Sequence, residues 1–135
     1  LGIISVILGI LTLGIVFNVL GLEEPSTLSN VGELPLIVKL LTITTAAVTE
    51  EIFYRGYSIE RIKELSGNII LGGVISGLIF LAIHYPGWGI AGGIPQLIFT
   101  IFITIFYIKK RNLTACIIMH WIINFFMIIV LPALV

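Results

Sequence analysis

Long apolar stretches, each close to the length that crosses a lipid bilayer, dominate this sequence. Short segments rich in charges, glycine or proline separate five of them, at residues 1–20, 36–57, 68–84, 94–108 and 113–134. A membrane-spanning helix requires about 20 mostly apolar residues. Because 59% of the 135 residues are hydrophobic and only 10% are charged, a water-soluble domain is excluded. The sequence therefore predicts an all-α, polytopic transmembrane helix bundle of about five spans, forming a single intramembrane domain.

The distribution of basic residues predicts the orientation of this bundle. Six of the seven basic residues lie in two connections, 55–67 and 109–112. In a five-span alternation these connections fall on the same side of the membrane, and the positive-inside rule makes that side cytoplasmic. We expect a multi-pass protein of a prokaryotic cell membrane with the lipid bilayer as a partner. The formal net charge of zero provides no basic face, so nucleic acid is not an expected partner.

Three ionisable residues lie close together in the second apolar stretch, in the segment TEEIFYRG (49–56). Charged groups inside a membrane cost about 2.5–3.5 kcal/mol each on insertion scales, so they face protein or water. Glu51 and Arg55 are four residues apart and share a helix face, which favours a pair. Glu50 points about 100° away around the helix axis, where only Tyr54 is within reach of a hydrogen bond. We expect Arg55 to neutralise Glu51 and Glu50 to remain free as a general base.

Both histidines of the chain lie in apolar stretches beside other polar or aromatic groups. His84 ends the segment FLAIH, and Phe80, four residues earlier, is expected to pack over it. His120 begins the segment HWIIN, in which Asn124 shares its helix face. A water molecule between Glu50 and His84 would be placed to attack a carbonyl group. His120 and Asn124 would then donate hydrogen bonds to the oxyanion that forms from this carbonyl oxygen.

The segments EEIFYRG, FLAIH and HWIIN resemble, in this order, the EExxxR, FxxxH and HxxxN motifs of the CPBP intramembrane protease family. That family includes the type II CAAX prenyl endopeptidases and the bacterial Abi proteins, and the similarity covers roughly residues 40–130. The resemblance implies an intramembrane endopeptidase that hydrolyses a peptide bond of a membrane-associated peptide or protein substrate. Family members commonly have about eight spans, so we expect this chain to lack N-terminal helices of a longer protein.

The resemblance also implies a role for each matched residue. Glu50 and His84 would activate water, and His120 and Asn124 would form the oxyanion site. The supporting residues would be Glu51 and Arg55 from the first motif, together with two neighbours singled out by their spacing, Tyr54 and Phe80.

Other interpretations fit the same residues. The hydrolysis requires no cofactor, but Glu50, His84 and His120 also form a known kind of catalytic zinc set. We rank zinc second because the compact HExxH spacing is missing. A Cys116–His120 nucleophile is disfavoured, because a thiol among apolar groups is normally inert. Outside enzymes, a membrane immunity or scaffold protein would use the polar cluster only to hold helices together. A proton-coupled transporter is disfavoured because no inverted repeat is visible.

Two glycine patterns bear on the third apolar stretch and the segment after it. Gly73 and Gly77 form a GxxxG motif, which lets helix backbones approach closely in lipid. His84 lies at the far end of this stretch, deeper than Glu50 by one to two helical turns. Either this span starts well outside the bilayer, or the following segment YPGWGIAGG (85–93) dips into the membrane. We favour the dip, as non-helical backbone lined by protein or water.

Overall fold

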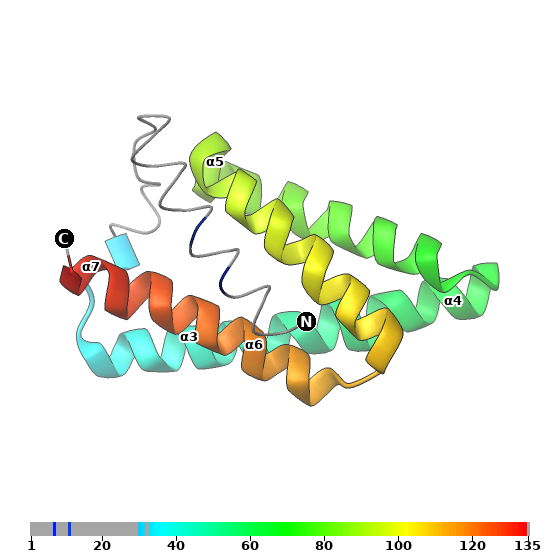
Figure 1. Cartoon of the computed structure of the whole chain (residues 1–135), viewed down its shortest axis with the longest axis horizontal. Coiled ribbons are helices and arrows are strands. Elements are labelled where there is room, and N and C mark those ends of the chain that lie inside the picture. The colour runs from blue at the N-terminus through cyan, green and yellow to red at the C-terminus, as the bar shows by residue number, and fades with distance from the viewer. Residues whose placement is uncertain (1–6, 8–10, 12–29, 32, 135) are drawn as a thin grey trace.

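A computed structural model describes residues 7, 11, 30–31 and 33–134, and every regular element among them is a helix (Figure 1). The all-α prediction is confirmed. In chain order, the elements are the helix α3 (Leu36–Glu51), the π-helix η2 (Ile52–Ile59), α4 (Glu60–Ser66), α5 (Ile69–Lys110), α6 (Leu113–Phe125), the π-helix η3 (Phe126–Val130) and α7 (Leu131–Leu134).

In the described part of the chain, three helices are long and apolar enough to cross a membrane: Ile69–Ile90, Gly92–Lys110 and Leu113–Val130. They correspond to the last three predicted spans, so the chain is an integral membrane protein. The predicted span 1–20 lies outside the described residues apart from Ile7 and Leu11. The count of about five spans is therefore not confirmed.

The predicted span 36–57 is helical but does not end where predicted. α3 has 16 residues and continues directly through η2 and α4 to Ser66. It is not among the three span candidates. The π-helical segment begins directly after the two glutamates, and such segments occur frequently at functional sites.

α5 is a helical hairpin rather than two spans joined by a loop (Figure 1). Only Gly89 departs from helical geometry inside it, with φ 58° and ψ −161°. This positive φ suits glycine, which has no Cβ to clash with the backbone. The expectation of non-helical backbone over 85–93 is therefore wrong except at Gly89, because one glycine is sufficient to reverse the chain. The depth of this segment in the membrane stays a prediction. The first arm, Ile69–Ile90, and the second arm, Gly92–Lys110, lie side by side.

Glycines allow the first arm to pack closely on both of its neighbours. A Cβ added at Gly73 would lie 2.8 Å from Ile108 Cδ1, and one at Gly77 would lie 3.3 Å from a methyl group of Thr100. The predicted role of the GxxxG motif in packing is thus confirmed, and its partner is the second arm. On the other side, a Cβ at Gly72 would lie 2.7 Å from the carbonyl oxygen of Ile59 in η2.

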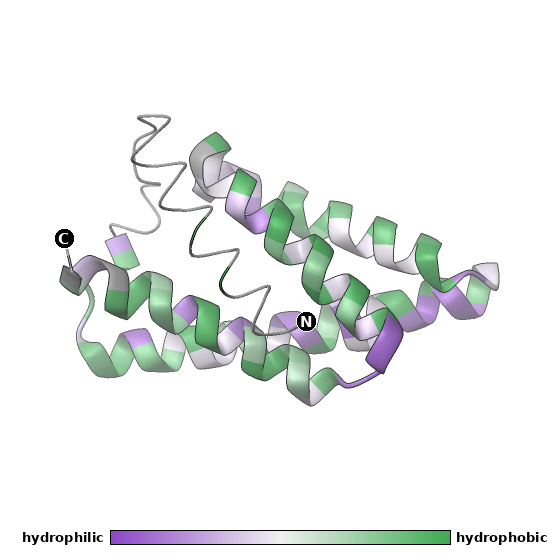
Figure 2. Ribbon diagram, viewed as in Figure 1, coloured by the Kyte–Doolittle hydropathy of each residue, from purple (hydrophilic) through white to green (hydrophobic). Residues whose placement is uncertain are grey.

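The basic connections meet at one end of the bundle, where hydrophilic residues gather (Figure 2). Arg111, which follows α5, forms an ion pair with Glu60 at the start of α4. The Tyr107 hydroxyl donates a hydrogen bond of 3.1 Å to the same carboxylate. The two connections therefore lie at the same end, as expected. The assignment of that end to the cytoplasm stays a prediction.

A buried core joins α3, η2, the second arm of α5 and α6. Its apolar members include Ile43, Ile59, Ile103, Cys116 and Ile123. Large apolar side chains also remain exposed along the outer faces of the helices, among them Ile70, Leu78, Ile101 and Ile122. In an integral membrane protein these faces contact lipid, so the polar groups between the helices occupy the interior.

Candidate active site

The centre of the site is a buried polar network that joins three residues from three elements. Glu51 at the end of α3 accepts a hydrogen bond of 2.7 Å from Arg55 Nη1 in η2. The same oxygen, Oε1, lies 2.8 Å from Nδ1 of His120 in α6. All three side chains are buried. The predicted Glu51–Arg55 pair is present. The structure adds a second partner, because α6 brings His120 to the same carboxylate oxygen.

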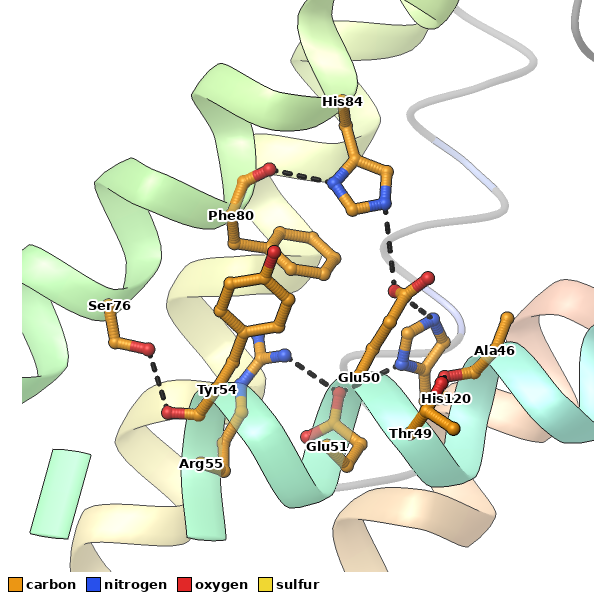
Figure 3. Close-up of polar contacts among 10 residues, drawn as sticks. All are labelled: Ala46, Thr49, Glu50, Glu51, Tyr54, Arg55, Ser76, Phe80, His84 and His120. Carbon is orange, nitrogen blue, oxygen red and sulfur yellow. Dashed lines mark hydrogen bonds and ion pairs between the residues drawn. The ribbon is translucent and has the colours of Figure 1, made fainter. Parts of the chain in front are cut away.

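Glu50 faces both histidines of the chain (Figure 3). Its Oε2 lies 3.6 Å from Nε2 of His84 and 3.8 Å from Nε2 of His120. These distances exceed those of direct hydrogen bonds. A quarter of the Glu50 side chain is exposed, whereas Glu51 is fully buried. The two adjacent glutamates therefore differ in environment: Glu50 is accessible between two imidazoles, and Glu51 is enclosed behind it.

Hydrogen bonds at Nδ1 orient both imidazoles. His84 Nδ1 lies 2.7 Å from the carbonyl oxygen of Phe80, which can only accept, so this nitrogen carries the hydrogen. His120 Nδ1 faces the Glu51 carboxylate, which already accepts from Arg55, and we assign a hydrogen to it as well. Both rings consequently direct Nε2 toward Glu50. This orientation leaves Nε2 of each ring as the atom able to act on a bound water or substrate.

Phe80 is the aromatic centre of the site. Its ring centroid lies 4.3 Å from that of His84, as predicted, and 4.9 Å from that of Tyr54. The Arg55 guanidinium carbon lies 4.9 Å from the same ring centroid. Only 2% of Phe80 is exposed. This packing restricts the rotation of the His84 ring and covers the buried cation with an aromatic face.

Tyr54 contributes through its backbone and ring rather than through its hydroxyl. In the described part of the chain, no hydrogen bond joins Tyr54 to Glu50, so that expected contact is not formed. The Tyr54 carbonyl oxygen instead accepts a hydrogen bond of 2.7 Å from Ser76 Oγ in the first arm of α5. This bond links η2 to α5 and fixes the segment that carries Arg55 (Figure 3).

Asn124 lines a cavity of about 60 Å³ together with His120. A polar cavity needs about 10–15 Å³ to hold a water molecule, so this one has room for ordered water or a small chemical group. Glu50 and His84 do not line it. The structure thus brings the two histidine Nε2 atoms to the same carboxylate oxygen, Oε2 of Glu50. It places Asn124 with His120 in the lining of the cavity.

Several other residues that line this cavity were not identified from the sequence as candidate site residues. Its lining includes Trp88 from the first arm of α5, and Gln96 and Phe99 from the second. The Phe99 ring also lies 5.3 Å, centroid to centroid, from the His120 ring. The available signal was the position of Gln96, an amide in an otherwise apolar helix. No motif singles it out, and its partner elements are distant in sequence.

The zinc alternative requires three ligands that converge on one point. In the parts of the chain that are described, no group of three or more His, Cys, Asp or Glu side chains is arranged to hold a metal ion. Glu50, His84 and His120 are near one another but do not form such a set as positioned here.

The chain matches a known protein family. A family model described as type II CAAX prenyl endopeptidase Rce1-like matches residues 32–126. This range contains α3 through α6 and therefore every residue of the network around Glu50. Neither the curated proteins nor the solved structures yielded a match.

Proposed function

This chain belongs to the type II CAAX prenyl endopeptidase Rce1-like family, and from that membership we propose that Glu50 and His84 activate the water that hydrolyses a peptide bond. The family and the apolar helices make the protein an intramembrane protease of the CAAX type, which acts on protein or peptide substrates at the membrane. The observation that supports the assignment of residues is the position of Glu50 Oε2, within 4 Å of both Nε2 atoms.

The proposed reaction uses Glu50 as the general base. A water molecule beside Glu50 Oε2 and His84 Nε2 loses one proton to the carboxylate while its oxygen bonds to the scissile carbonyl carbon. The tetrahedral intermediate then collapses as its carbon–nitrogen bond breaks. The proton held by Glu50 passes to the leaving amine nitrogen. His84 is held by Phe80 and orients the water, because its Nε2 is directed at the same oxygen.

His120 and Asn124 are proposed to stabilise the oxyanion. His120 Nδ1 faces Glu51, so a hydrogen on its Nε2 would point into the space beside Glu50 and would donate to the oxyanion. Asn124 is half-buried and adds an amide donor on the same cavity wall. Donors that are held in place before the reaction stabilise a developing charge most effectively.

The test is Glu50→Gln, which keeps the size of the side chain but removes the base. We expect the hydrolysis of a farnesylated peptide ending in a CAAX sequence to fall by about 10²- to 10⁴-fold, the usual contribution of a general base. The melting temperature in detergent should stay within a few degrees of wild type, because Glu50 is partly exposed and its side chain forms no direct hydrogen bond with another described residue. Glu64→Gln is the control, since Glu64 is an exposed acid on α4.

Cleavage at the wild-type rate by Glu50→Gln would exclude the proposed base. Full activity of this variant in a host phenotype, with no cleavage by either protein, would instead favour the immunity or scaffold function.

One observation favours the zinc-dependent version as a second candidate. Both histidines donate Nδ1–H to protein acceptors, as metal-binding histidines usually do. Glu50, His84 and His120 would be the ligands only after a rearrangement, because the described residues hold no set of three such side chains positioned for a metal ion. Metal analysis of the purified protein, with cleavage measured after thorough chelation, separates the two candidates. Activity that survives chelation with no bound zinc excludes the metal version.

A further inference from the structure

We propose that Gln96 binds the main chain of the substrate by accepting a hydrogen bond from a peptide N–H at its side-chain oxygen. The inference rests on the proposed function, because it assigns a substrate contact to the cavity next to His120. It adds to the site a residue outside the three motifs.

Two helix faces with matched spacing enclose this cavity. The second arm of α5 contributes residues 92, 95, 96 and 99, and α6 with η3 contributes residues 120, 123, 124 and 127. Both sets follow the i, i+3, i+4, i+7 pattern of one helical face. Gln96 therefore stands on one wall of the cavity and His120 and Asn124 on the other, so that a single peptide group held between them would contact both.

The side-chain oxygen of Gln96 is buried without a hydrogen-bond partner among the residues that the structure describes. A buried, unpaired acceptor costs about 1–3 kcal/mol, so such groups call for an explanation. Neither His120 nor Asn124 donates a hydrogen bond to this oxygen. An amide oxygen can only accept, so the missing partner is a donor such as a substrate N–H.

The geometry of a peptide bond fits this division of roles. In a planar trans peptide the C=O and N–H groups point in opposite directions. A carbonyl oxygen directed at His120 and Asn124 on one wall therefore directs the N–H of the same unit at the other wall, where Gln96 lies. One wall would stabilise the oxyanion and the other would fix the register of the substrate.

The experiment measures binding rather than turnover. A fluorescent farnesylated CAAX-type peptide is titrated in detergent into Glu50→Gln and into the double variant Glu50→Gln/Gln96→Met, and Kd is read by anisotropy. We expect the double variant to bind about 2- to 12-fold more weakly, the usual value of one net hydrogen bond. The matched control is Thr100→Val. Thr100 also has a buried oxygen with no partner among the described residues and lies one helical turn later, but it does not line the cavity. This control should leave Kd unchanged.

A set of peptides then identifies the donor. Each amide flanking the cleavage position, and the scissile amide itself, is replaced in turn by an ester, which removes one N–H. Hydrolysis does not interfere, because the background is Glu50→Gln. We expect one ester to weaken binding to Glu50→Gln as much as Gln96→Met does, with no further loss in the double variant.

Equal binding of every ester peptide to Glu50→Gln would overturn the proposal, even if Gln96→Met failed to fold. An equal loss from Thr100→Val would overturn it as well. Failure of the proposed function would show separately, as a lack of cleavage by the wild type or normal cleavage by Glu50→Gln.

Discussion

His120 Nδ1 lies 2.8 Å from Glu51 Oε1, although 69 residues separate the two in the chain. The contact joins the second glutamate of the EExxxR motif to the first residue of the HxxxN motif. Because the same oxygen accepts from Arg55, the glutamate both neutralises a buried cation and holds the imidazole. We therefore infer that Glu51 is a positioning residue for His120, while Glu50 faces the reacting water.

The buried Glu51–Arg55 pair gives a first prediction. It distinguishes the effect of the pair on the stability of the fold from its effect on the position of His120. Arg55→Met leaves the Glu51 carboxylate without its cation and should destabilise the protein by about 3–5 kcal/mol. The double variant Glu51→Leu/Arg55→Met should recover much of that stability, because both charged groups are gone. Cleavage should remain low, since His120 has lost its partner. Thermal unfolding in detergent and peptide cleavage are the measurements, and recovery of activity in the double variant would refute the positioning role.

The close approach of η2 and α5 gives a second prediction. Gly72→Ala should lower the melting temperature, because its Cβ would meet the Ile59 carbonyl oxygen at 2.7 Å and the backbone must shift. Gly93→Ala is the matched control, since its added Cβ would meet no atom of the described chain within 4 Å. Alanine is favoured over glycine inside a helix by up to about 1 kcal/mol, so the control should be neutral or slightly stabilised. Equal melting temperatures for the two variants would contradict the packing described here.

Cys116 provides a third prediction, which tests the nucleophile alternative. Its side chain is fully buried in the core, so thiol reagents should not inhibit cleavage by the folded protein. Cys116→Ala should retain cleavage while losing some stability, because a small cavity replaces the sulfur atom. Activity and melting temperature are measured side by side. Complete loss of cleavage in a variant that still folds would restore the Cys–His hypothesis.

The basic end of the bundle gives a fourth prediction, on membrane topology. Ser66→Cys and Lys110→Cys should react with a membrane-impermeant maleimide from the same side, which we predict to be cytoplasmic. Ile90→Cys, at the end of the first arm of α5, should react only from the other side. Cys116 does not interfere because it is buried. Labelling of positions 66 and 110 from opposite sides would contradict the topology.

The sequence by itself determined the features that depend on neighbouring residues. Apolar stretches of membrane length predict helices, because lipid leaves backbone groups no other partners. Glu51 pairs with Arg55 and Phe80 packs on His84 because residues four apart share a helix face. The candidate site residues could also be recognised in the sequence, because few ionisable side chains occur in these spans.

Only the tertiary structure decided which of these groups meet. His120 joins Glu51, and Glu50 comes between two imidazoles, because α3, α5 and α6 pack together. Helical periodicity gives the direction of a side chain around its own axis but not the rotation or depth of the helix facing it. The glycine-rich segment 85–93 marked the break between two spans, but the place of Gln96 on the cavity wall depends on that packing, so no local pattern could predict it.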